Sequence, residues 1–121
     1  MNNNPKFDLE ERTAKFGENI IKFCRSLKKD IITDPLVNQL VRASTSVGAN
    51  YCEADDAESG KDFKHKIGIC KKESRESKHF LRMIASSNPE VKDEIKIFWS
   101  EAKELNLIFN SIYKKVGTKL T

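Results

Sequence analysis

The stretch from residue 34 to residue 58, DPLVNQLVRASTSVGANYCEADDAE, decides the predicted fold. It opens with Asp34 and Pro35, which favour an N-cap and the first helical position, because the carboxylate accepts unpaired N–H groups and proline has none to leave unpaired. Apolar and small residues then recur at alternating three- and four-residue spacing, the rhythm of a helix packed on one side. This core arc consists of Val37, Leu40, Ser44, Val47, Tyr51 and Ala54. We therefore expect an amphipathic helix over residues 35–58.

A second arc of this helix is wholly polar and lies roughly 120° from the core arc, at about 100° per residue. It carries Gln39, Arg42, Ser46, Asn50 and Glu53. Gly48 costs about 1 kcal/mol relative to alanine inside a helix, so its presence nearby indicates that another backbone approaches the arc. The arc is either a solvated row of hydrogen-bonded side chains or a partly buried polar seam. Such a seam fixes the register of the helices that pack against it, either within one subunit or between two. We favour the seam.

Three more segments have the same apolar spacing. They predict helices over residues 8–29, 61–86 and 89–116, after a frayed segment 1–7 and before a tail 118–121, with Asn88 and Pro89 repeating the cap-and-proline start and Gly117 ending the last helix. Ile31 and Ile32 are expected to fold back over one end. The predicted core positions are Leu9, Thr13, Phe16, Ile20, Phe23 and Leu27; Phe63, Ile67, Cys70, Ser74, Ser77, Leu81 and Ile84; and Val91, Ile95, Phe98, Ala102, Leu105, Phe109, Ile112 and Val116. Long helices with short connections predict an all-α fold, an antiparallel up-and-down four-helix bundle forming one domain over residues 8–117.

The composition agrees with one helical domain outside a membrane. The chain has 121 residues, of which 33% are charged and 38% hydrophobic. No apolar run approaches the roughly 20 residues of a membrane span, and the N-terminus lacks the layout of a signal peptide. We expect a cytoplasmic protein with no membrane partner.

The sequence offers no assembled catalytic or metal site. Glu76 and His79 supply one Glu-x-x-His, but di-iron bundles need this motif on two helices, and both residues point away from the predicted core. The near-copy from Asp62 to His65 lies on the same helix. Three cysteines without close spacing indicate neither a disulfide framework nor a zinc site, and no nucleophile–histidine set or phosphate loop is present. We therefore expect no cofactor, no metal, no catalytic residue and no enzymatic activity.

The positive charge of the chain is concentrated in one stripe. Residues 61–82 hold eight basic and three acidic residues, net +5, whereas the formal charge of the whole chain is +4. The stripe consists of Lys61, Lys64, Lys71, Arg75, Lys78 and Arg82. Cations repeated along about 27 Å of helix, at 1.5 Å per residue, can neutralise several phosphates of a nucleic acid. A solvated face and one half of a salt-bridged subunit contact are the alternatives, and no aromatic residue interleaves the stripe along this helix to stack on bases.

The last helix predicts self-association. Trp99, Ile108 and Tyr113 lie outside its core spacing, so this helix has a wider apolar face than a monomer of this size needs. Surplus apolar surface on a short bundle commonly marks a subunit interface. We expect a homo-oligomer.

The segment QLVRASTSVGANYCEA, residues 39–54, resembles the Gln-x-x-Arg-Ala-x-x-Ser-x-x-x-Asn-x-x-Glu signature of the bacterial four-helix-bundle family of 23S rRNA intervening-sequence proteins. The similarity continues at residues 72–76, 80–81, 104–105 and 108–109. Departures are Ser77, where the family commonly has threonine, and Asp55 and Asp56, where relatives often have glycine. The resemblance implies a ring-like homo-oligomer, commonly a pentamer, and no known catalysis. A related branch, the accessory variability determinant proteins of diversity-generating retroelements, implies binding of nucleic acid and of a reverse transcriptase.

Two functional hypotheses follow. The first is a non-catalytic oligomer that binds RNA or DNA through the basic stripe. The second is a protein-interaction scaffold, or accessory subunit of a partner enzyme such as a reverse transcriptase, in which the stripe contacts an acidic protein surface.

Overall fold

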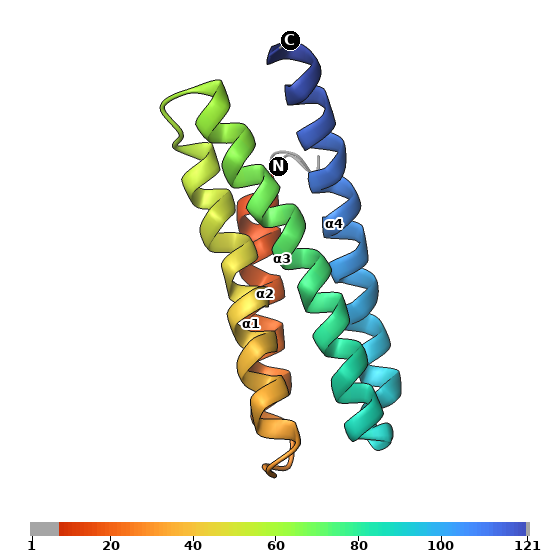
Figure 1. Cartoon of the computed structure of the whole chain (residues 1–121). Coiled ribbons are helices and arrows are strands. Elements are labelled where there is room, and N and C mark those ends of the chain that lie inside the picture. The colour runs from red at the N-terminus through yellow and green to blue at the C-terminus, as the bar shows by residue number, and fades with distance from the viewer. Residues whose placement is uncertain (1–7, 121) are drawn as a thin grey trace.

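The computed structural model describes the backbone of residues 8–120 and the side chains of residues 8–117. Four long helices alternate in direction (Figure 1), which confirms the predicted all-α four-helix bundle. Their bounds are Leu9–Ser26 (α1), Thr33–Asp55 (α2), Gly60–Ser87 (α3) and Lys92–Leu120 (α4), with a single 3-10 turn, η1, at Pro89–Val91. The predicted frayed segment 1–7 lies outside the described residues.

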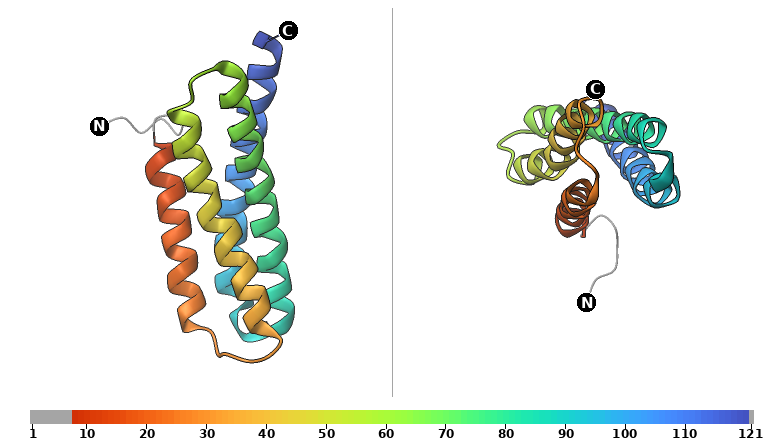
Figure 2. Two further views of the ribbon diagram at one scale, coloured as in Figure 1. Left: turned by 60° about the vertical axis from the view of Figure 1, so that its left-hand side comes forward. Right: turned by 90° about the horizontal axis from the view of Figure 1, so that it is seen from below.

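Helix α3 is the centre of the arrangement. It packs extensively on α2 along one side and on α4 along the other, whereas α1 packs mainly on α2 and meets α4 over a shorter contact. The end-on view in Figure 2 shows α2, α3 and α4 side by side with α1 standing against them. Both side margins of α3 are therefore helix interfaces, and only its outer face is left for solvent.

The contact between α1 and α4 combines an aromatic pair with an ion pair. The rings of Phe23 and Phe98 lie 5.2 Å apart. Arg12 forms a two-pronged salt bridge with Glu101, at 2.7 and 2.8 Å, and a third contact with Glu104 at 3.1 Å. The hydrogen bond to Glu101 raises the pKa of Arg12 above its usual value, so the guanidinium stays charged and α1 stays tied to α4.

The predicted core positions are buried or half-buried in all four helices. Most are less than 5% exposed, including Phe16, Leu40, Ile67 and Phe109, and Leu27 at the end of α1 is 9% exposed. Seven are half-buried: Val37, Tyr51, Phe63, Val91, Phe98, Ile112 and Val116. The three- and four-residue apolar spacing thus identified the face that each helix turns inward.

The start of α2 differs from the prediction. Asp34 is not the cap, because the helix begins at Thr33 and the carboxylate of Asp30 instead accepts the N–H groups of Ile32 (3.0 Å) and Thr33 (2.6 Å). The hydrogen bond from the Thr33 backbone is the main cause that lowers the pKa of Asp30. Pro35 lies in the first turn, where its missing N–H has no helical partner to lose.

The end of the bundle is closed by polar groups. Ile31 and Ile32 do not fold over it, as they are 88% and 65% exposed. Instead the buried Thr33 hydroxyl lies 3.0 Å from the Ser87 hydroxyl and accepts a hydrogen bond from the Asn88 side chain at 3.1 Å. These bonds join the start of α2 to the end of α3, so this end of the bundle is closed without apolar residues from the connection before α2.

Three helix ends also differ from the prediction. Helix α1 stops at Ser26 and α2 at Asp55, each three residues before the predicted end at 29 and 58. Helix α4 continues through Gly117 to Leu120, so Gly117 does not end it and the backbone of residues 118–120, predicted as a tail, is helical. Gly117 has a negative φ like the rest of the helix, so nothing in its backbone forces a stop.

The glycine of α2 marks a close approach of α1. A Cβ on Gly48 would lie 3.3 Å from the hydroxyl of Thr13, and one on Gly17 would lie 3.6 Å from Thr45. The backbone that approaches Gly48 is therefore that of α1, about half a turn around the helix from the polar arc, where the sequence predicts the approach. A close approach was predicted correctly, but on the wrong side of the helix.

Candidate nucleic-acid interface

The margin of α3 that faces α2 is an ion-pair seam built on Arg42. Its guanidinium contacts Glu73 at 2.7 Å and Glu76 at 2.6 Å, and its Nε donates to the side chain of Gln39 at 3.2 Å. Glu73 is only 4% exposed, so its charge depends on Arg42 for compensation. The hydrogen bond to Glu76, followed by the charge of Glu73, raises the pKa of Arg42.

The remaining polar-arc residues continue this seam in two ways. The Asn50 amide donates to the hydroxyl and to the carbonyl of Ser46, both at 2.9 Å, within α2. Glu53 reaches across to Lys66 of α3 at 3.2 Å. Ser46 and Asn50 are half-buried, whereas Gln39, Arg42 and Glu53 are exposed. The arc therefore lies at the edge of the α2–α3 contact, with Glu73 as its buried member.

The opposite margin of α3, facing α4, carries lysines placed over aromatic rings. The ammonium groups of Lys64 and Lys71 lie 4.7 and 4.9 Å from the centre of the Tyr113 ring. Lys78 and Lys103 lie 5.5 and 5.6 Å from the centre of the Trp99 ring. These distances are those of cation–π contacts, which hold a lysine end in place while leaving its N–H donors available.

These partners match because both helices repeat every seven residues. Lys64, Lys71 and Lys78 stand at seven-residue intervals on α3, and Trp99, Asn106 and Tyr113 do so on α4. The helices run in opposite directions, so Tyr113 meets the first two lysines and Trp99 the third. Between the rings, the Asn106 amide donates to the Lys71 carbonyl at 2.7 Å and contacts the Ser74 hydroxyl at 3.3 Å. We call the three lysines with Tyr113 and Trp99 the lysine–aromatic row.

Two glycines allow this row to form. A Cβ on Gly68 would lie 3.2 Å from the Tyr113 ring, so the ring rests close to the α3 backbone. A Cβ on Gly117 would lie 2.9 Å from the Lys64 ammonium group. Glycine at these positions therefore leaves the space that the ring and the lysine end occupy.

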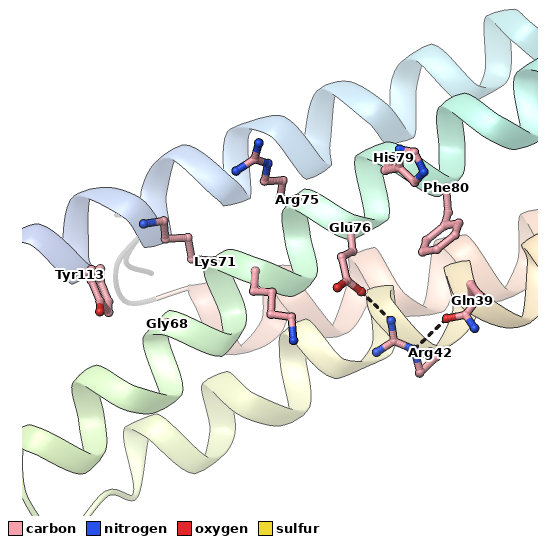
Figure 3. Close-up of a pocket in the computed structure, with 10 residues that line it drawn as sticks. Gln39, Arg42, Gly68, Lys71, Arg75, Glu76, His79, Phe80 and Tyr113 are labelled. Atoms are coloured by element: carbon pink, nitrogen blue, oxygen red, sulfur yellow. Dashed lines mark hydrogen bonds and ion pairs between the residues drawn. The ribbon is translucent and has the colours of Figure 1, made fainter.

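The outer face of α3 between the two margins is open and basic. A shallow hollow of about 1000 Å³ runs from Gln39 and Arg42 across α3 to Tyr113. Figure 3 shows Lys71 and Arg75 reaching from α3 toward the α4 side, while Arg42 is tied to Glu76 on the α2 side. Lys61, Lys72, Arg75 and Arg82 are exposed, and Lys64, Lys71 and Lys78 are half-buried. All six predicted stripe residues thus lie on the outer face of α3 or on its α4 margin.

Sequence reasoning missed part of this site. It found no aromatic residue along the stripe, but the structure brings Tyr113 and Trp99 of α4 to its edge, and it also omitted Lys72 and Lys103. The shared seven-residue spacing of α3 lysines and α4 aromatics was the available signal. The sequence analysis instead places the two rings at a subunit interface.

That assignment changes as well. Trp99, Ile108 and Tyr113 are half-buried and pack against the core of their own chain. Among the described side chains of α4, the large apolar ones that are exposed are Ile97 (68%) and Leu107 (57%). An apolar interface on this part of α4 would use these two residues.

The cysteines and histidines offer no reactive site. Burial raises the pKa of Cys24 to about 11 and that of Cys70 to about 12, so both are neutral thiols at physiological pH. Burial and then Glu10 raise the pKa of the exposed Cys52. His65 and His79 are exposed. Across residues 8–117, no three His, Cys, Asp or Glu side chains gather in a geometry that would hold a metal ion.

Within the described part of the chain, no helix has the length and apolar character needed to cross a bilayer.

With this geometry in place, comparison with known proteins decides the family. The model of the 23S rRNA-intervening sequence protein family matches residues 6–111. The chain belongs to this family. It is also similar to a crystal structure, determined at 1.70 Å, of a protein of unknown function from the S23 ribosomal protein family of Bacteroides thetaiotaomicron VPI-5482. The two share 25% identity and a TM-score of 0.77 over 87% of this chain and 97% of the other.

The 23S rRNA-intervening sequence family takes its description from a segment of ribosomal RNA and not from a reaction. A search of curated proteins gave no match. The predicted family resemblance is confirmed, and the fold of the Bacteroides protein agrees with the bundle observed here.

Proposed function

We propose that this member of the 23S rRNA-intervening sequence family is a non-catalytic, homo-oligomeric protein that binds RNA or other nucleic acid through the outer face of α3. One observation carries the proposal: charged side chains are paired with opposite charges on one margin of α3 and with uncharged rings on the other. On the α2 side, Arg42 compensates Glu73 and Glu76. On the α4 side, the cations of the lysine–aromatic row face rings that carry no net charge. The stripe therefore keeps its positive charge for an external anion.

The chemistry of the face suits a polyanion. The six stripe residues and Lys72 follow α3, and Glu73 and Glu76 of the same helix are paired with Arg42. Each cation that neutralises a phosphate releases a condensed counterion, which makes binding favourable and salt-dependent. The face does not form an enclosed pocket for a small substrate, because the hollow is shallow and its described lining holds no activated nucleophile.

The test is binding as a function of salt. Fluorescence anisotropy with labelled RNA should give a log K that falls with log salt concentration by about 0.9 for each phosphate contacted in a duplex. Changing Lys71, Arg75 and Lys78 together to Glu should abolish measurable binding and flatten the slope. The matched control changes Lys15, Lys22 and Lys29, exposed on and just after α1, to Glu and alters net charge equally. Equal loss in both variants, or no salt-sensitive binding by the wild type, would refute the proposal.

The oligomer is the second part of the proposal. The exposed Ile97 and Leu107 provide apolar contact area on α4. Surplus exposed apolar surface supports a homo-oligomer, and a pentamer is the state that the family resemblance leads us to expect. Light scattering on the purified protein tests this directly. Ile97→Lys and Leu107→Lys should lower the measured mass, whereas a wild-type monomer would contradict the oligomer.

A scaffold is the alternative function. The same exposed apolar residues, together with Ile21 of α1 at 38%, would serve a partner protein as well as a second copy. A partner enzyme, such as a reverse transcriptase, or another protein with an acidic surface would then occupy the basic face. Pull-down from cell extract, with and without nuclease, separates the hypotheses. A partner retained after nuclease treatment favours the scaffold.

A further inference from the structure

We infer that the lysine–aromatic row binds the sugar–phosphate backbone of a double helix, without regard to base sequence, and that Tyr113 and Trp99 position the lysines for this contact. The inference rests on the proposed function and specifies its ligand class. It is carried by the pairing of Lys64 and Lys71 with Tyr113, and of Lys78 with Trp99.

The lysines of the row are held in place along one helix. At 1.5 Å per residue, the backbone positions of Lys64, Lys71 and Lys78 follow one another at about 10.5 Å intervals. The ammonium groups of Lys64 and Lys71 lie closer together than this, because both are within 5 Å of the centre of the Tyr113 ring. A duplex carries one phosphate charge per roughly 1.7 Å of its axis, so about 12 charges pass along the 21 Å between the end lysines. These phosphates follow both strands around the duplex, so the row meets those on the side of the duplex that faces it.

The rings of the row are not free to stack on bases. Single strands are commonly bound on open aromatic faces. Here the ring of Tyr113 has two ammonium groups within 5 Å of its centre and Gly68 of α3 against its edge, and Trp99 has two lysines near it. Both rings are also half-buried. Their role is to hold lysines, so an unpaired base gains nothing at this face.

The side chains of the row have no access to base edges in a groove. Lysine reads guanine and Asn or Gln amides read adenine only when they reach into a groove. The Asn106 amide nitrogen donates to the Lys71 carbonyl and contacts the Ser74 hydroxyl, and the Gln39 oxygen accepts from Arg42. A single helix of about 10–12 Å diameter fits the major groove, but α3 is flanked by α2 and α4 along its length, so it cannot enter one. Contact is therefore limited to the backbone.

Positioning by the rings strengthens this contact. A free lysine side chain loses much rotational freedom when it binds a phosphate, and a lysine already held over a ring has lost part of it beforehand. The ammonium group keeps its N–H donors for the phosphate oxygens. Tyr113 and Trp99 are therefore positioning residues that touch the lysines and not the ligand.

The experiment compares four labelled probes at one salt concentration: a 20-base-pair RNA duplex, a DNA duplex of the same sequence, and one unstructured pyrimidine strand of each sugar. Anisotropy should show both duplexes binding at least tenfold more tightly than either strand. A second duplex of unrelated sequence should bind within twofold of the first. The RNA and DNA arms tell which backbone the row prefers. The emission of Trp99, the one tryptophan of the chain, should shift on adding duplex to the wild-type protein.

Two variants test the positioning role. Tyr113→Leu should weaken duplex binding by about two- to fivefold for each lysine it releases, the factor that corresponds to an exposed cation–π contact. Tyr113→Phe keeps the ring and should bind within twofold of the wild type. Circular dichroism on both variants confirms that the bundle remains folded.

The outcomes separate the inference from the function on which it rests. If no probe binds, the proposed function fails and the inference fails with it. If the single strands bind as tightly as the duplexes, or if a folded Tyr113→Leu variant binds like the wild type, nucleic-acid binding stands and the inference alone is overturned. A strong preference for one of the two duplex sequences would also overturn it.

Discussion

The two margins of α3 have similar packing partners but opposite electrostatic characters. Toward α2, positive and negative side chains meet, with Arg42 shared between Glu73 and Glu76. Toward α4, lysines meet uncharged rings. In the first arrangement opposite charges neutralise each other within the fold. In the second, the lysines are held in place and their charges are not neutralised. The comparison teaches that a row of polar residues on a helix becomes structure or binding surface according to what the next helix sets opposite it.

Replacing Arg42 should have the largest effect on stability and a small one on binding. Arg42→Ala leaves the buried Glu73 without its partner, which we expect to lower the free energy of unfolding by about 1–3 kcal/mol. Urea denaturation measures the loss. Gln39→Ala, which removes one hydrogen bond and leaves both ion pairs, should stay within about 0.5 kcal/mol of the wild type.

The comparison would fail if the Arg42 substitution reduced binding without reducing stability. If Arg42→Ala kept its melting temperature and oligomer size but lost nucleic-acid binding, the α2–α3 seam would be a binding site and not an element of the fold. We expect affinity for RNA to change by less than about twofold per released carboxylate, because the freed Glu76 is partly screened by solvent.

The Asp30 cap gives a smaller, pH-dependent effect on the α2 side. Its pKa is lowered by the Thr33 backbone hydrogen bond, so the folded state binds a proton less readily than the unfolded chain. The stabilisation is therefore present above the unfolded pKa of about 4 and is lost as the pH falls through the lower folded pKa. Thermal melts of Asp30→Ala should lie below the wild type at pH 7 and approach it at pH 2–3.

Asp30→Asn is the matched variant, because asparagine also accepts N–H groups at a helix start. It should melt close to the wild type at pH 7 while losing the acid-dependent part. A constant difference between wild type and Asp30→Ala across this pH range would show that the carboxylate charge does not stabilise the start of α2.

Gly68→Ala should have the smallest effect on stability and sharpens the α4 side of the comparison. Alanine in a helix gains up to about 1 kcal/mol over glycine, and the new Cβ, 3.2 Å from the Tyr113 ring, offsets part of that gain. Unfolding should therefore change by less than about 1 kcal/mol, while the displaced ring releases Lys71 and weakens RNA binding by about twofold.

Gly60→Ala, in the exposed first turn of α3, serves as the control for propensity alone. Unchanged RNA affinity in Gly68→Ala would show that Tyr113 can shift without disturbing the lysines, and the row would then bind through charge alone.

Much of the fold could be predicted from the sequence, because apolar residues occupy the buried positions of each helix and their spacing can be read along the chain. The spacing of Phe16, Leu40, Ile67 and Phe109 identified the inward faces. The helix ends were less well predicted. Asp34 looked like a cap by residue type, but Asp30 had the same chemistry and the connecting turn placed its carboxylate against the first N–H groups of α2.

The candidate site was predicted only on one helix. Periodicity placed the six stripe residues together on α3, since that depends on a single helix. The buried position of Glu73 and the pairing of lysines with Tyr113 and Trp99 depend on which neighbour lies on each side and in what register. Those contacts join residues more than twenty positions apart. The residue spacing within one helix does not say how the neighbouring helix is rotated about its own axis.

By itself, then, the sequence determined four amphipathic helices, the direction of each inner face and a helix with concentrated positive charge. Local spacing is sufficient for these, because a helix repeats every 3.6 residues whatever surrounds it. The tertiary structure alone decided that the acids beside Arg42 are neutralised by α2 and that the lysines are held by α4. Both depend on the order in which helices pack around α3, and this order turns one margin into a seam and leaves the other charged.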